Sequence, residues 1–173
     1  MRVLKFVPVR TVLAPLLVLG AAPLLAQPAG HHVERGPIQL PEVVQRAAVI
    51  VRGTVASSRV EWVDRTIFTF HDLAVSESIK GPTRTSITVA VSGGAIGNVR
   101  TVWPGAPTIR LGDELFFFGT AFQGRPAFEA VGLFDGLVEV HTDPATGNRL
   151  VAPRGRTEKI EDFLSEVRAL GRR

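Results

Sequence analysis

The sequence contains no cysteine, no tyrosine and only one methionine among its 173 residues. Without cysteine, the protein cannot form disulfides, use thiolate catalysis or build zinc or iron–sulfur sites on sulfur ligands. Charged residues make up only 21% of the chain and hydrophobic residues 45%, which excludes a chain kept unfolded by its charge. The 17 glycines have no three-residue period, which excludes a collagen-like chain. The length suits one domain with a core of ordinary size.

The first 26 residues have the pattern of a secretory signal peptide. Arg2, Lys5 and Arg10 precede an apolar run, Thr11 to Ala26, that ends in small residues. A membrane-spanning helix is the alternative, but a span needs about 20 apolar residues, and this run is shorter and contains two prolines. The sequence therefore predicts a secreted or periplasmic protein, cleaved after Ala26 and without a membrane span after cleavage.

Cleavage after residue 26 changes the charge of the protein. Three basic residues and no acidic ones leave, so the formal net charge falls from +4 to +1. A net charge this small does not attract the phosphate backbone of nucleic acid strongly, and we expect no nucleic-acid partner. The absence of cysteine also excludes acyl anchoring as a bacterial lipoprotein.

Strand and turn patterns dominate residues 39–155, which follow a flexible lead-in predicted for residues 27–38. A short helix is expected at 40–47. Alternating or continuous apolar residues then predict strands at 49–55, 66–75, 87–91, 115–118, 128–133, 137–141 and 150–152, the 115–118 strand being buried on both sides. Strands of this number, separated by turn signals, favour a mainly β fold, a small antiparallel OB-like β-barrel.

A closing amphipathic helix is expected within residues 156–171, packed on the barrel. Thr157 is suited to cap it, and Gly171 to end it. The apolar residues between them follow helical spacing, at Ile160, Phe163, Leu164, Val167 and Leu170.

Two strands carry signals of a bend. Gly53 interrupts the 49–55 strand, where glycine usually marks a bulge or a sharp bend. In the 66–75 strand, the two phenylalanines share one face, whereas the leucine and valine that follow share the other. One extra residue near His71 and Asp72 would reconcile the two halves, so we predict a β-bulge there.

No catalytic motif is complete, and we assign no catalytic residue. No serine lies in a GxSxG elbow, no histidine has HExxH spacing, and Gly93–Gly97 lacks the lysine of a P-loop. His71 and Asp72 are the one adjacent histidine and carboxylate inside a predicted element. A hydrolytic site built on them would need another acid, such as Glu61 or Glu77.

Metal and cofactor sites are equally incomplete. His31 and His32 are good ligands for Cu²⁺ or Ni²⁺, but an unstructured tail accounts for them better. Asp113 and Glu114 are a pair of potential Ca²⁺ ligands, and two ligands do not make a site. We therefore expect no metal and no cofactor.

The Gly93–Arg110 segment is the strongest candidate for a binding site. It is long, broken by glycine and proline, and predicted to lack regular structure, as working loops often do. It carries Arg100, Trp103 and Arg110, and tryptophan and arginine are enriched at binding hot spots. Trp62, near a predicted turn, is a further candidate. The alternatives are that the segment forms a lid on the barrel and that Trp62 caps one end.

Four segments also resemble a group of uncharacterised bacterial exported domains. The patterns of that group are V-x-G-x-V, V-x-x-x-L-K-G, V-x-G-G and G-E/D-x-x-L-F-F. The similar segments here are Ala48–Val55, a strand that ends in Ile79–Gly81, Val89–Gly94 and Leu111–Phe118, with Ile79 at the leucine position of the second pattern. The layout is distantly similar to netrin-like and metalloproteinase-inhibitor domains. The resemblance implies an OB-type barrel and export, but no activity. Those inhibitors insert an amino-terminal cysteine into the protease metal site, so their mechanism cannot apply to this chain.

These observations favour an exported, non-enzymatic domain that binds a protein or cell-envelope ligand. Two alternatives stay open at this stage. One is a hydrolytic enzyme with an unfamiliar histidine and carboxylate site. The other is a structural partner of another envelope protein, bound through the closing helix or an open sheet edge. The oligomeric state is not determined by the sequence.

Overall fold

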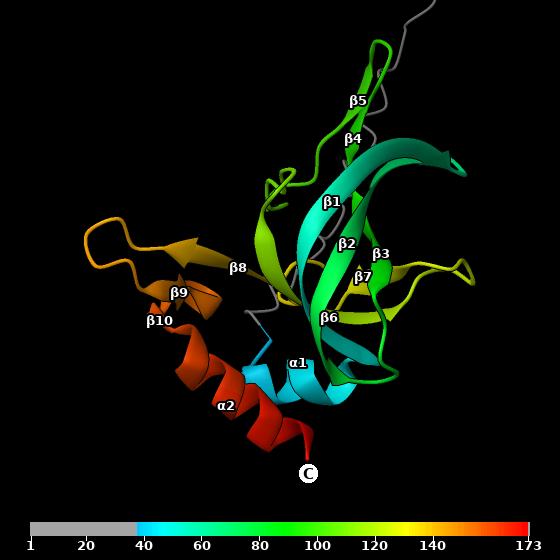
Figure 1. The fold of residues 1–173 in the computed structure, drawn as a ribbon. Coiled ribbons are helices and arrows are strands. Elements are labelled where there is room, and N and C mark those ends of the chain that lie inside the picture. The colour runs from blue at the N-terminus through cyan, green and yellow to red at the C-terminus, as the bar shows by residue number, and fades with distance from the viewer. Residues whose placement is uncertain (1–37, 173) are drawn as a thin grey trace, which may run out of the picture. The chain divides into compact units, whose positions relative to one another are not determined.

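The computed structural model describes residues 38–172, which form a mainly β structure with two α-helices (Figure 1). The predicted signal peptide and all but the last residue of the predicted lead-in lie outside these residues. No helix within 38–172 is long and apolar enough to span a membrane. The elements in chain order are α1 (Leu40–Arg46), β1 (Val49–Val63), β2 (Thr66–Lys80), β3 (Ser86–Ser92), β4 (Gly94–Ile96), β5 (Val99–Thr101), β6 (Glu114–Ala121), β7 (Phe128–Ala130), β8 (Leu137–Thr142), β9 (Arg149–Val151), a 3₁₀ turn (Pro153–Gly155), β10 (Glu158–Lys159) and α2 (Ile160–Gly171).

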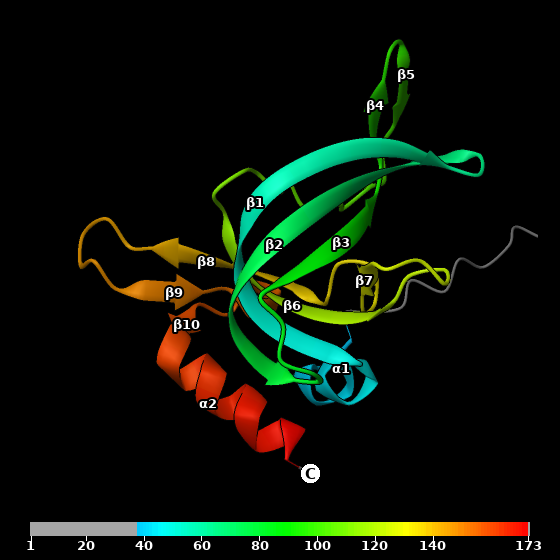
Figure 2. The ribbon, with the colours of Figure 1, turned by 45° about the vertical axis from the view of Figure 1, so that its right-hand side comes forward.

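The main sheet is organised around β1 (Figure 2). β1 pairs with β2 along nearly all of its length and with β6 from Val49 to Thr54. β2 pairs with β3, β3 pairs in parallel with β7, and β7 pairs with β6. The pairings therefore run in a ring from β1 back to β1, and β8, β9 and β10 extend the sheet from β6.

The bend predicted at Gly53 is confirmed. The register between β1 and β2 shifts between Arg52 and Gly53, with further shifts on either side. A Cβ atom at Gly53 would lie 2.6 Å from the carbonyl oxygen of Ala74. Only glycine permits this close approach of the two backbones, and the approach lets β1 pair with β2 and β6 at once.

The prediction of a bulge in β2 near His71 and Asp72 is wrong. β2 pairs with β3 in continuous register through both residues. The extra residue lies across the ladder in β1, where Ala56 falls between the pairs Val55–Leu73 and Ser57–Asp72.

The apolar pattern of β2 changes faces because different parts of the strand are buried on different sides. Phe68 and Phe70 pack against Phe122 on one face, with ring centroids 5.0 and 5.9 Å from that of Phe122. Leu73 points to the other face, into a cluster that includes Val89. A strand covered first on one side and then on the other needs no extra residue.

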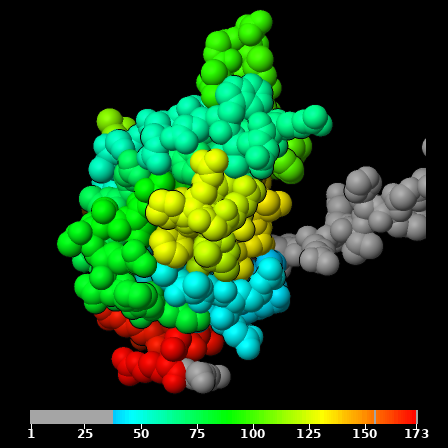
Figure 3. All heavy atoms as spheres, turned by 90° about the vertical axis from the view of Figure 1, so that its right-hand side faces the viewer, coloured from blue at the N-terminus to red at the C-terminus, as the bar shows by residue number. Residues whose placement is uncertain are grey.

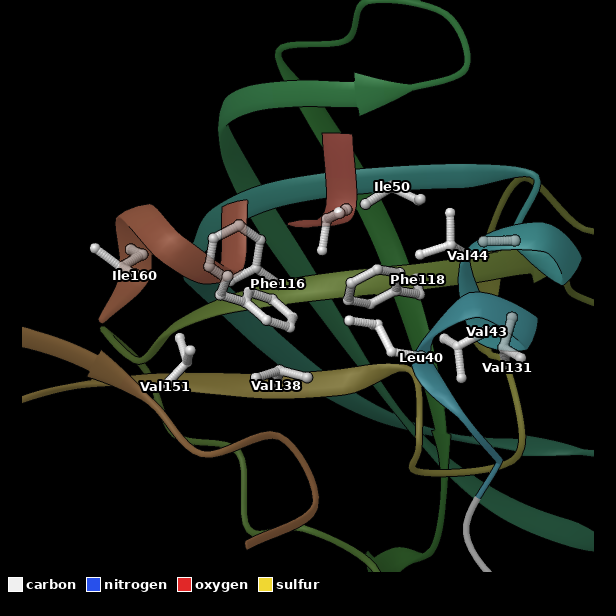
Figure 4. Packing of buried hydrophobic residues seen from close by; sticks show 13 residues of the cluster. Leu40, Val43, Val44, Ile50, Phe116, Phe118, Val131, Val138, Val151 and Ile160 are labelled. Atoms are coloured by element: carbon white, nitrogen blue, oxygen red, sulfur yellow. The ribbon is translucent and has the colours of Figure 1, made fainter. Parts of the chain in front are cut away.

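β6 is buried on both sides, as predicted. Leu115 and Phe117 contribute to the cluster of apolar side chains shared by β1, β2 and β3. Phe116 and Phe118 point the other way, into a second cluster covered by α1 and α2 (Figure 4). The ring of Phe163, from α2, meets Phe116 edge-on with ring centroids 5.1 Å apart. The run of apolar residues in β6 therefore joins the two halves of the core.

Three further predictions need correction. The 93–110 segment is not wholly irregular, because β4 and β5 form a hairpin that projects from the body of the protein (Figure 3). The strand predicted at 128–133 ends at Ala130, where turns begin. Thr157 does not cap α2, because Glu158 and Lys159 first pair with β9 and keep the chain extended up to Ile160.

We expect Phe163→Ala to lower the free energy of unfolding by about 3–5 kcal/mol, because it empties the space between α2 and β6. Phe163 is fully buried, whereas Leu133 is 60% exposed. Leu133→Ala is the matched control and should change the same quantity by no more than about 0.5 kcal/mol. Urea denaturation followed by circular dichroism measures both, and equal losses would contradict the assigned core.

Candidate functional site

The β1–β2 hairpin continues past the ring of strands, and its inner face forms one wall of the candidate site. We define the inner face by the pairs Ser58–His71, Val60–Thr69 and Trp62–Ile67, which lie opposite one another in the ladder. Alternation places this face on the same side as Leu73, in the strand cluster of the core. The core side of the sheet therefore extends outward as a partly open surface.

The start of the 93–110 segment is fixed against this inner face by backbone contacts. The Gly93 N–H donates to the Ile67 carbonyl over 2.8 Å, and the Thr69 hydroxyl donates to the Gly93 carbonyl over 2.8 Å. A Cβ at Gly94 would lie 2.8 Å from Val60 Cγ1. Both glycines also have positive φ, at 114° and 140°, so this close approach requires glycine.

A cleft of about 340 Å³ lies between the inner face and the rest of the segment. Its lining includes Thr69 and His71 from β2, Ser92 from β3, and Arg100 and Trp103 from the segment. We call this the hairpin cleft. Its polar side-chain groups are hydroxyls, an imidazole, an indole N–H and a guanidinium, and no carboxylate lines it.

The structure brings together two of the four residues predicted to bind a ligand. Arg100 and Trp103 line the hairpin cleft, and Trp103 is 42% exposed. Trp62 lies on the inner face and is 46% exposed, but it does not line the cleft. Arg110 is exposed beyond the cleft, where its backbone N–H donates to Asp113 over 2.6 Å in the turn that leads into β6.

The sequence pairs His71 with its neighbour Asp72, but in the structure the imidazole contacts Ser58 instead. His71 is only 5% exposed, the one polar residue in the buried class among residues 38–172. Its Nδ1 lies 2.7 Å from the Ser58 hydroxyl, in the next strand. Burial lowers the pKa of His71, and the nearby charges of Asp72 and Asp113 oppose that shift. Ser58 was missed because its contact depends on the register set by Ala56.

Asp72 lies on the opposite, outer face of the hairpin, so it does not share a site with His71. Its carboxylate accepts hydrogen bonds from Thr88 over 2.7 Å, Ser57 over 2.8 Å and Arg59 over 3.2 Å. The Thr88 hydrogen bond contributes most to lowering the pKa of Asp72, followed by those from Ser57 and Arg59. Three donors hold this carboxylate ionised on a surface that the cleft does not reach.

The acids proposed to complete a hydrolytic site are also engaged elsewhere. Glu61 pairs with Arg59 at 2.8 Å and lies 3.9 Å from Arg125 on the outer face. Glu77 pairs with Arg52 and Arg168 near the other end of β2. The structure therefore does not bring Glu61 or Glu77 to His71.

Potential metal ligands do not gather within residues 38–172, where no three histidine or carboxylate side chains come together. Asp113 accepts the backbone N–H of Arg110, and Glu114 pairs with Arg52 at 3.0 Å and also with Arg149. The two histidines at 31 and 32 lie outside the described residues.

No protein-family profile matches the chain, and no curated protein is significantly similar to it.

We expect the free energy of unfolding to decrease below about pH 6.5, partly through His71. Its pKa in the folded protein is below the ordinary value of 6.5, so the unfolded chain takes up a proton first as the pH falls. The contribution is complete above pH 6.5 and is lost as the pH falls toward the lowered pKa. His71→Asn keeps an acceptor for Ser58 and should flatten this part of the profile.

Urea denaturation at several values between about pH 7 and pH 5 tests this expectation. His141→Asn is the matched control, because His141 is exposed on β8. Parallel profiles for the wild type and His71→Asn would show that the buried imidazole is not the source of the acid sensitivity.

Proposed function

We propose that this protein is an exported, non-enzymatic domain that binds a protein or cell-envelope ligand in the hairpin cleft. An OB-like barrel is the fold we propose for it. The ring of strand pairings and the strongly bent β1 support that fold. The basic and apolar pattern of residues 1–26 supports export.

The observation that carries this proposal is that Trp103 and Arg100 both line the cleft. A half-exposed indole offers a flat apolar surface, and a guanidinium offers five hydrogen-bond donors and a positive charge. Because no carboxylate lines the cleft, its charge favours a ligand with an anionic or hydrogen-bond-accepting group. Tryptophan and arginine are the residue types that dominate binding energies in such positions.

The cleft is held in shape before a ligand arrives. Gly93 fixes one end of the segment to β2, as described above. At the other end, the Gly112 N–H donates to the Val55 carbonyl, and the Val55 N–H donates to the Asp113 carbonyl, each over 2.9 Å. Within the segment, the Ala106 N–H donates to the Trp103 carbonyl over 3.1 Å. A wall fixed at both ends loses less conformational entropy when it binds.

A hydrolytic function is a second candidate because Ser58 Oγ lies 2.7 Å from His71 Nδ1. An imidazole in that position is suited to accept the serine proton. Asp72 lies on the outer face, so the pair lacks the third group that usually orients the imidazole. Ester hydrolysis by the wild type that Ser58→Ala abolishes would favour this candidate over binding alone.

We expect Trp103→Ala and Arg100→Ala each to weaken ligand capture by about tenfold or more, because each removes a central contact. The bait is immobilised protein, exposed to solubilised cell-envelope extract, and the captured components are quantified by mass spectrometry. Leu133→Ala and Arg172→Ala are the matched controls, because both residues are exposed outside the cleft. They should leave capture unchanged.

Fluorescence provides a second measurement of the same site. The chain has two tryptophans, so Trp62→Phe leaves Trp103 as the only one. A captured component that binds in the cleft should shift the emission of Trp103. Capture that is equally strong with both cleft variants, or binding that leaves this emission unchanged, would place the ligand elsewhere.

A further inference from the structure

Within residues 38–172, the second half of β1 has a strand along one of its edges only. From Ser57 to Val63, β1 pairs with β2 along one edge only. The other edge is occupied by β6 up to Thr54 and by the Gly112–Asp113 turn at Val55. Among residues 38–172, no other backbone hydrogen bond reaches positions 57–63. This open stretch follows the outer border of the β1 arch in Figure 2. Open edges of this kind are templates for pairing with another strand.

The geometry of the β1–β2 turn determines which backbone groups face the open edge. Val63 and Thr66 close a two-residue turn, so they form the hydrogen-bonded pair of a tight hairpin. Hydrogen-bonded positions alternate along an antiparallel strand. The N–H and C=O groups of Ser58, Val60 and Trp62 therefore point away from β2, toward the open edge.

We propose that the open edge of β1 pairs with the same edge of a second copy of this protein. The two strands run antiparallel about a two-fold axis at Val60. In this register, Val60 meets Val60 of the second copy, and Ser58 meets Trp62, so the outward-pointing backbone groups of all three residues find partners. The contact is isologous and closes as a dimer.

Charge complementarity favours a second copy as the occupant. Arg59 and Glu61 both lie on the outer face, 48% and 42% exposed. Pairing about Val60 places Arg59 opposite Glu61 of the second copy, and Glu61 opposite Arg59. The neighbouring registers that also satisfy the hydrogen bonds put arginine opposite arginine or glutamate opposite glutamate. Opposite charges across a ladder stabilise it and like charges destabilise it, so the sequence selects one register.

The apolar residues on the inner face fit the same arrangement. Val60 and Trp62 are 38% and 46% exposed in the single chain. In the paired strands, Trp62 lies diagonally beside Val60 of the second copy, within reach of its side chain. The dimer therefore joins the apolar residues of the two copies into one strip, while the charges pair on the opposite face.

Val60→Pro tests the pairing at its centre. Proline has no N–H, but the Val60 N–H makes no hydrogen bond to another group in residues 38–172, so the fold should tolerate the change as edge strands do. We expect the wild type to be a dimer in sedimentation equilibrium and Val60→Pro to be a monomer with an unchanged far-ultraviolet circular dichroism spectrum. A wild type that is monomeric at every concentration, or a dimer that survives Val60→Pro, would overturn the proposal.

Charge exchange tests the register. Arg59→Glu and Glu61→Arg each place like charges opposite one another, and each should weaken the dimer by about tenfold or more. Mixing the two variants restores both opposite-charge pairs, and so does combining the substitutions in one chain. We therefore expect association in the mixture and in the double variant. Arg46→Glu, at an exposed ion pair on α1, is the matched control and should leave the dimer intact.

The mixture and the double variant show whether a single substitution weakens the dimer through its charge or by destabilising the fold. Arg59 also pairs with Asp72 in the same chain, so a single substitution can weaken β1 itself. Failure of both the mixture and the double variant to associate, when the wild type does, would exclude the register centred on Val60.

Discussion

The structure depends on one strand that pairs with two others. β1 is 15 residues long, and only its first part pairs with β6, while nearly the whole strand pairs with β2. A straight strand could not stay in both ladders, because the sheet closes on itself. The bend is possible where the backbones of Gly53 and Ala74 come together, at a distance that excludes any side chain. The ring of strands, the division of the core by β6 and the placement of α1 and α2 all require this bend.

The same strand also creates the surfaces that lie outside the core. Because β1 and β2 continue past the ring, their inner face loses its cover of strands and is partly covered by the segment that begins at Gly93. His71 lies at this transition, close enough to the core to be buried and close enough to the cleft to line it. The open edge at residues 57–63 has the same origin, since β6 has already turned away. The cleft and the open edge thus have one cause, because β1 pairs with β2 as far as Val63 but with β6 only as far as Thr54.

Much of this architecture could be predicted from local patterns, and the rest depends on contacts between distant residues. The buried strand β6 and the helix α2 could be predicted because the spacing of apolar residues along the chain reflects burial directly. The bulge at Ala56 could not be predicted from the sequence. No glycine or change of pattern marks it in β1, and the only sign near it is the change of apolar face in β2. The β4–β5 hairpin was missed because its strands have three residues each, too few to show alternation. Without the register of β1, Ser58 could not be placed beside His71.

Pairing at the edge of β1 bears on how the hairpin cleft would work. A two-fold axis through an antiparallel ladder runs perpendicular to the sheet, so both copies present their inner faces on the same side. The two clefts would then open on one surface, with Trp103 and Arg100 repeated across the axis. A polymeric or membrane-attached ligand that offers repeated groups could occupy both clefts at once, and the second contact would form at a high effective concentration. A cleft that binds weakly in a single copy would in this way hold the proposed ligand firmly, without any additional contact within the site.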